Sequence, residues 1–266
     1  MFETLVDAPI SQLPASLVAL LLFGLMLLFF WLGQMWRINR LSHAKTARED
    51  NTGSLEGSML GLLALLLAFT FGISNSRYDA RRDVIIKEAN CIGTAVLRAD
   101  LYPEPFRSEL RADFKEYVED RIKYYEVGTN LDSIRAALSQ SQVISSRIWT
   151  KVSQRASNDS PYIRNTFFLQ SLNDVIDVAN ERRYIGISRV PVSIIWMMIL
   201  LCLVVSFLLG YGMKGKKPDW LMVCIFSLII SMTTYLILDL DRPREGIITM
   251  NAVHQSMLDL RDLFKP

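Results

Sequence analysis

Four long apolar runs, set as two pairs around one polar stretch, dominate the pattern of this chain. None of them contains Asp, Glu, Lys, Arg or His, and they cover roughly Pro14–Trp36, Gly57–Ser74, Pro191–Met213 and Trp220–Leu238. Helices of 18 to 23 residues are long enough to cross the hydrocarbon layer of a bilayer. Lipid offers the backbone no hydrogen-bond partners, so runs of this kind should be helical. The pattern predicts a polytopic membrane protein with four transmembrane helices in two hairpins.

The polar stretch between the second and third runs has the spacing of amphipathic helices. Apolar residues recur at steps of three and four over 106–125, and no period-two stretch is long enough for a sheet. The same spacing predicts helices over 76–100, 131–152 and 161–183, with Ser160 as the N-cap of the last. The first of these continues the second apolar run beyond the membrane. The fold class is therefore predicted to be all-α.

The domain organisation follows from these elements. A transmembrane hairpin is expected over 1–76, a helical soluble domain over 77–188 and a second transmembrane hairpin over 189–240. The last segment, 241–266, has a modest amphipathic pattern and is expected to form a surface tail. The soluble helices should pack as a bundle on the ends of the membrane helices.

Composition narrows the class of protein further. A net charge of +2 gives no reason to expect nucleic acid as a partner. The chain has two histidines, far apart, and three cysteines, so neither a metal site nor a cofactor is expected. Phosphate loops, zinc motifs and nucleophile elbows are absent from the sequence. These observations argue against an enzyme.

The short loops favour one orientation in the membrane. The loop 37–54 holds four basic residues and the turn 214–217 holds three, whereas the first 13 residues hold none. Basic short loops tend to stay in the cytoplasm, so we expect Lys216 inside and Lys123, with the soluble domain and both termini, outside. Six arginines at the membrane end of that domain oppose this assignment: Arg77, Arg81, Arg82, Arg182, Arg183 and Arg189.

Small residues mark one face of the second apolar run. They recur at steps of 4, 3, 4, 4 and 3, at Gly57, Gly61, Ala64, Ala68, Gly72 and Asn75. Small faces let membrane helices approach closely, within one chain or between copies, so helix packing is one interpretation. The other is a narrow ion pathway with an apolar lining, a type of constriction that gates channels by dewetting.

Charged residues lie at both ends of this helix. Glu56 opens it, where a carboxylate can cap the helix, pair with Lys45 or Arg48, or bind a cation or a proton. At the other end a charged mouth is expected, either as structural ion pairs or as a vestibule that concentrates ions. Asp241 is expected to pair with Arg82. The candidate residues of this mouth are Arg82, Glu88, Asp239, Asp241 and Arg242.

Three features together resemble a bacterial membrane protein family described as bestrophin-like. They are Glu56 opening the second run, the segment from Arg82 to Ala89, and Leu240-Asp241-Arg242-Pro243 followed by Gly246. The resemblance covers nearly the whole chain and implies a multi-pass protein of the bacterial inner membrane. Bestrophins are pentameric anion channels with a cytosolic domain, an apolar neck near the second span and an acidic calcium clasp. No acidic cluster like that clasp is present here.

Two functions are left open by these observations. The first is a homo-oligomeric channel that conducts small ions passively along the second span. The second is a non-conducting membrane scaffold or stress sensor whose soluble helices bind a partner. No ionisable side chain enters a span, which argues against a proton relay or charge-coupled pump.

Overall fold

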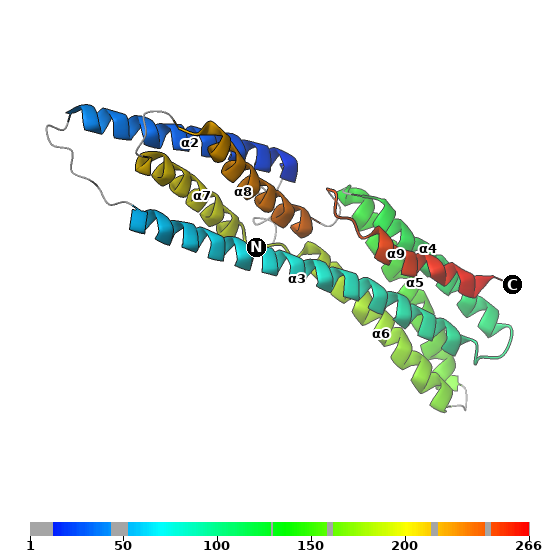
Figure 1. The fold of residues 1–266 in the computed structure, drawn as a ribbon. Helices are drawn as coiled ribbons and strands as arrows, with labels where there is room; N and C mark the ends of the chain where they lie inside the picture. The colour runs from blue at the N-terminus through cyan, green and yellow to red at the C-terminus, as the bar shows by residue number, and fades with distance from the viewer. Residues whose placement is uncertain are drawn as a thin grey trace. The chain divides into compact units, whose positions relative to one another are not determined.

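The computed structural model describes residues 13–43, 53–128, 130–158, 162–213, 218–242 and 246–265. Within these ranges the chain is almost entirely helical and contains no strand (Figure 1). The helices are α2 (Ala15–His43), α3 (Gly53–Ala99), α4 (Phe106–Glu126), α5 (Leu131–Asn158), α6 (Tyr162–Ile187), α7 (Val192–Gly212), α8 (Trp220–Asp241), α9 (Asn251–Asp259) and the 3-10 helix η2 (Leu260–Phe264). The predicted all-α class is confirmed.

The described residues form two compact units. Those within 1–77 and 189–242 make up the membrane unit, and those within 78–188 and 243–266 make up the polar unit. Helix α3 is unbroken from Gly53 to Ala99 and contributes to both, as the unbroken helical spacing predicts. Ser160, the expected N-cap of α6, lies outside the described residues.

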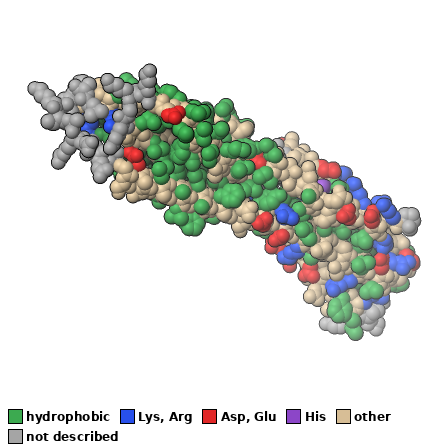
Figure 2. Space-filling model, viewed as in Figure 1, with side chains coloured by type: hydrophobic (Ala, Val, Ile, Leu, Met, Phe, Trp, Pro, Cys, Tyr) green, Lys and Arg blue, Asp and Glu red, His purple; other side chains and the backbone are tan. Residues whose placement is uncertain are grey.

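The membrane unit contains the helices that are long and apolar enough to cross a bilayer: α2, the first part of α3, α7 and α8. Its core joins all of them through Met26 of α2, Leu63 of α3, Cys202 of α7 and Ile237 of α8. Large apolar side chains also point outward, and Figure 2 shows hydrophobic residues covering much of this unit on the face drawn. Such a surface is costly in water and suited to lipid.

The closest packing in the membrane unit joins α2 to α7. A Cβ built on Gly33 of α2 would collide with the carbonyl of Phe207, and one on Gly210 of α7 would collide with the carbonyl of Phe30. Each glycine lets the partner backbone approach where any side chain would prevent it. Helix α2 also packs on α8, where Phe30 meets Trp220 edge to face at 6.0 Å. The main partners of α2 thus come from the other predicted hairpin.

The polar unit packs α3, α4, α5, α6 and α9 around one apolar core. The predicted stripe of α4 is buried, with Leu110, Phe114 and Val118 at most 1% exposed. Helix α9 and η2 add Met250, Val253, Met257 and Leu260 to the same core. We expected a surface tail here, and the structure differs because the apolar face of the tail completes the core.

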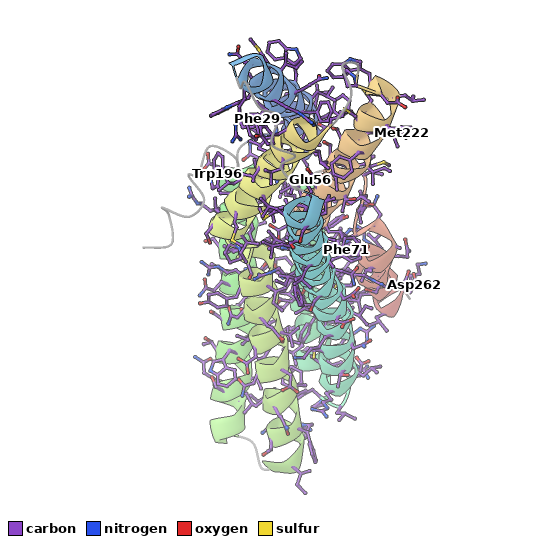
Figure 3. All side chains as sticks on the ribbon, turned by 60° about the vertical axis from the view of Figure 1, so that its left-hand side comes forward. Phe29, Glu56, Phe71, Trp196, Met222 and Asp262 are labelled. Atoms are coloured by element: carbon purple, nitrogen blue, oxygen red, sulfur yellow. The ribbon has the colours of Figure 1, made fainter. Side chains whose placement is uncertain are left out.

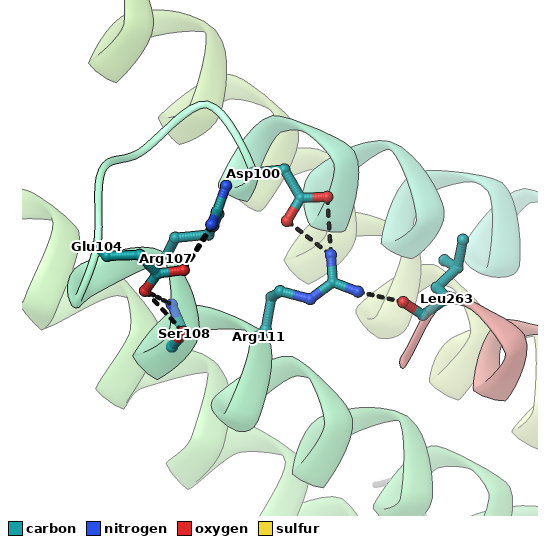
Figure 4. Close-up of polar contacts among 6 residues, drawn as sticks. All are labelled: Asp100, Glu104, Arg107, Ser108, Arg111 and Leu263. Carbon is teal, nitrogen blue, oxygen red and sulfur yellow. Dashed lines mark hydrogen bonds and ion pairs between the residues drawn. The ribbon is translucent and has the colours of Figure 1, made fainter. Parts of the chain in front are cut away.

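Polar contacts tie the α3–α4 connection to the C-terminal segment (Figure 4). Arg111 of α4 forms an ion pair with Asp100 at 2.6 Å and donates a hydrogen bond to the carbonyl of Leu263 in η2. Glu104 accepts hydrogen bonds from the main chain and hydroxyl of Ser108 at the start of α4. Helix α4 ends before Gly128, whose φ of 62° is left-handed and favours glycine.

Candidate functional site

The small-residue face of α3 is exposed along its whole length. Gly57, Gly61, Ala64, Ala68, Gly72 and Asn75 all lie on the surface of the chain. A Cβ built on Gly57, Gly61 or Gly72 would have no atom of the described chain within 4 Å. These positions therefore do not pack against another described helix of the same chain. What remains for this face is contact with another copy, a pathway or lipid.

A different face of α3 holds the helix in the membrane unit. Leu63, Leu67, Thr70 and Ser74 are buried, at helical steps of 4, 3 and 4. Leu63 and Leu67 belong to the core that also contains residues of α2, α7 and α8. The hydroxyl of Thr70 donates a hydrogen bond to the carbonyl of Leu66 at 2.7 Å, so this buried polar group has its partner within α3. One side of α3 is thus anchored and the small-residue face is open.

The open face carries no charge between its two ends. Phe71 lies farther along α3 than Glu56, as Figure 3 shows. Exposed Leu62, Leu65 and Phe69 flank the small residues. The first ionisable side chain after Glu56 is Arg77, so the intervening surface is uncharged.

Glu56 lies where α3 begins and α7 ends. It is half-buried in the first turn of α3, and a Cβ on Gly212 would collide with its carboxylate. The N-terminal end of α3 favours a negative charge, whereas the C-terminal end of α7 does not. The partners considered for Glu56, Lys45 and Arg48, lie outside the described residues.

The residues of the predicted charged mouth are divided between the two units. In the membrane unit Asp239, Asp241 and Arg242 are buried at the end of α8. Both carboxylate oxygens of Asp241 accept from the main-chain N–H of Val190, at 3.0 and 3.1 Å. Arg242 donates to the carbonyl of Leu13. These contacts fasten the end of α8 to the chain segments that lead into α7 and α2.

The other two residues of the predicted mouth lie in the polar unit. Arg82 is exposed, whereas Glu88 has no exposed surface. A buried carboxylate cannot concentrate ions from solution, so of the two roles considered for Glu88 its burial favours a structural ion pair over a vestibule. The Asp241–Arg82 pair would join two units and stays a prediction.

Glu88 is the centre of a buried charge cluster. Arg121 of α4 donates from Nε to one carboxylate oxygen at 2.5 Å, and Arg182 of α6 donates from Nη1 to the other at 2.5 Å. The ring of Tyr124 lies 4.8 Å from the Arg121 guanidinium and 5.2 Å from that of Arg182. Burial opposes the charge of Glu88, but the two arginines hold the pKa of the carboxyl below its usual value. The cluster links α3, α4 and α6.

Sequence reasoning missed both arginines of this cluster. Arg121 does carry a signal, because it falls within the apolar stripe of α4, four residues after Tyr117 and one before Ile122. A charged residue on a face that must be buried indicates an internal partner. Arg182 carries no comparable signal, because its sequence neighbours group it with the arginines at the membrane end of the domain.

His254 is another buried titratable group of the polar unit. Its ring stacks on Tyr125 at 4.1 Å, with 21° between the planes. Neither ring nitrogen has a hydrogen-bond partner among the described residues. Burial and then the charge of Arg182 lower the pKa of His254, while Glu126 acts in the opposite direction and Arg261 in the same one. The neutral ring therefore belongs to the folded state.

Comparison with known proteins assigns the family. Residues 13–252 match the model of the bestrophin-like domain, and the chain belongs to this family. A solved variant of the bacterial bestrophin homologue from Klebsiella pneumoniae superposes with a TM-score of 0.66 at 15% identity, covering 95% of this chain and 99% of that one. A second structure of that homologue gives a TM-score of 0.65 at 14% identity, with 92% and 96% covered. No curated protein matches the sequence.

We expect Glu88→Gln to lower the free energy of unfolding by about 3–5 kcal/mol, because it leaves two buried guanidiniums without their counter-charge. The control is Glu181→Gln. Glu181 pairs with Lys87 at 2.7 Å between the same two helices, α3 and α6, but in solvent. That loss should be much smaller, because an ion pair in solvent contributes little to stability. Urea unfolding of both variants in mild detergent compares them, and equal losses would contradict the role given to the buried cluster.

We expect the protein to lose stability as the pH falls below about 6.5, the usual pKa of histidine. Because the pKa of His254 is lowered in the folded state, the unfolded state takes up its proton first, and stability falls from that pH down to the folded pKa. His254→Phe keeps a ring against Tyr125 but cannot titrate. Thermal unfolding from about pH 7 to pH 5 should show a smaller decline in this variant, and parallel curves would refute the assignment.

Proposed function

We propose that this bestrophin-like protein forms a homo-oligomer that conducts small ions passively along the open face of α3. The observation that carries the proposal is the exposure of Gly57, Gly61, Ala64, Ala68, Gly72 and Asn75 on a helix whose other side is anchored in the membrane unit. Membership of a family named after ion channels supports it.

A small-residue face gains more from contact with another helix than from contact with lipid. Gly61 and Gly72 offer little surface for dispersion contact with acyl chains, whereas a second helix backbone can approach them closely. Copies arranged with these faces inward would surround a path with apolar walls. Such a path can open and close by wetting and dewetting. Without an ionisable group between Glu56 and Arg77, it would move ions passively.

The second candidate is a non-conducting scaffold or stress sensor. It is favoured by large apolar side chains on α6 of the polar unit, where Ile163 is 71% exposed, Phe167 52% and Tyr184 71%. Exposed apolar groups of this size are typical of surfaces that bind another protein. We propose neither an enzymatic role nor a cofactor, because the sequence contains none of the motifs that would support them.

Ion flux into liposomes tests the channel proposal. We expect the purified parent to be an oligomer that conducts, and Gly61→Leu to reduce flux to the background of empty vesicles because the added side chain fills the path. The matched control is Gly24→Leu, since Gly24 of α2 is also exposed with no described atom within 4 Å of a built Cβ. Its flux should equal that of the parent.

The other possible results of this flux experiment distinguish the channel from the scaffold and from a packing surface between copies. An oligomeric parent without flux would favour the scaffold. Parental flux in Gly61→Leu would place the path elsewhere. Loss of the oligomer in Gly61→Leu alone, seen by size-exclusion chromatography, would identify the face as a packing surface between copies rather than a path.

For orientation, we propose that the polar unit lies outside the cytoplasm of a bacterial inner membrane, as the basic short loops favour. Lys123 is exposed on α4, whereas Lys216 lies outside the described residues. In a chain without its natural cysteines, Lys123→Cys should react with an impermeant maleimide in whole cells and Lys216→Cys only after lysis. The reverse pattern would place the polar unit in the cytoplasm.

A further inference from the structure

A groove lies on the surface of the membrane unit between α2 and α7. Its volume is about 440 Å³, and it is lined by Phe29, Leu32, Met35, Trp36 and Asn39 of α2 and Phe207 of α7. Trp36 and Phe207, which both line it, meet edge to face with their ring centroids 5.8 Å apart. Leu32, Met35 and Trp36 are 37%, 54% and 64% exposed, so the groove is open to its surroundings.

The glycine contact between α2 and α7 explains why a groove forms here. At Gly33 and Gly210 the two backbones are in contact. Larger side chains beside this contact therefore project from the surface of the helix pair. Phe29, Leu32 and Trp36 follow one another at steps of three and four along α2 and form one wall. The result is a groove with mostly apolar walls, which suits a hydrocarbon chain.

The groove has a cationic end. Arg40 lies one helical turn beyond Trp36, and Arg37 one turn beyond Gly33. Both are tethered to the end of α7: Arg37 donates from Nη1 to the Tyr211 carbonyl at 3.2 Å, and Arg40 donates to the Tyr211 hydroxyl. The polar side chain of Asn39 lines the groove at the same end.

The acids nearby do not balance these cations. Neither α2 nor α7 contains Asp or Glu. Glu56 lies at this end, against Gly212, the residue after Tyr211, and Asp219 caps the start of α8. In the sequence, the segments 37–56 and 214–219 together hold seven Lys or Arg residues and four Asp or Glu residues, which leaves a positive excess at this end.

We propose that this groove binds one anionic phospholipid, with an acyl chain along Phe29, Leu32 and Trp36 and the phosphate at Arg37 and Arg40. The ligand must be long, apolar and anionic at one end, and it must be reached from the bilayer. Guanidiniums recognise phosphate oxygens through charge-assisted hydrogen bonds, and basic side chains at the membrane surface attract anionic lipids. The site is separate from the open face of α3 and does not depend on ion conduction.

Native mass spectrometry of the full chain in mild detergent tests the headgroup contact, with phosphatidylglycerol and phosphatidylcholine of identical acyl chains as probes. The parent should prefer phosphatidylglycerol. In Arg37→Gln/Arg40→Gln this preference should fall roughly thirtyfold, the size expected for two cationic side chains at an anionic lipid surface. The control, Arg135→Gln/Lys265→Gln, removes the same charge from exposed positions of the polar unit and should retain the preference.

A second pair of variants tests the groove itself. Leu32→Trp fills it and should lower the number of bound phosphatidylglycerol molecules by one. Leu20→Trp makes the same change elsewhere on α2, where the side chain is 67% exposed, and should bind as the parent does. Both should keep the elution volume of the parent.

Several results would overturn the proposal. They are equal binding of the two lipids by the parent, an unchanged preference in the double arginine variant, and displacement of the lipid by inorganic phosphate at equal concentration. The last would indicate a site for a free anion. A change of oligomeric state in Leu32→Trp alone would indicate an interface between copies instead.

Discussion

Hydrocarbon cannot form hydrogen bonds with a peptide group, and the architecture of the membrane unit depends on this constraint. It requires each spanning segment to satisfy its backbone internally, and therefore to be helical. It also removes the hydrophobic drive that holds helices together in water. The helices of the membrane unit accordingly depend on close contact, as at Gly33 and Gly210, and leave their large apolar side chains for lipid.

The same physics separates two kinds of small residue in this protein. Gly33 and Gly210 are in contact with a partner backbone, so their role is fulfilled within one chain. The small residues of α3 have no such partner among the described residues, although they recur regularly, at steps of three and four, along one face of the helix. A regular small face left open in the membrane is the reason to look outside the chain for its function. The proposed oligomer supplies that partner, and the proposed path gives the face a use.

The polar unit follows different rules, because its helices can exclude water from a common core. It nevertheless buries a carboxylate, Glu88, and two guanidiniums, those of Arg121 and Arg182. Ionised groups are expensive to bury, and their mutual attraction offsets that cost only when the geometry is good. Here both carboxylate oxygens are engaged and the ring of Tyr124 lies beside both cations. The cluster joins three helices at one defined register, which an apolar contact would specify less strictly.

The sequence alone determined the properties that depend on local pattern. Four apolar runs, the unbroken course of α3 and the stripe of α4 were predictable, because hydropathy and helical spacing are written in neighbouring residues. The sequence did not predict which helices pack against each other. Helix α2 packs mainly on α7. The ion-pair partners of Glu88 lie 33 and 94 residues away from it in the sequence. Helix α9 packs on a core most of whose other residues are far from it in the sequence. Which face of α3 stays open and which charges are buried depend on such long-range contacts, and only the tertiary structure decides them.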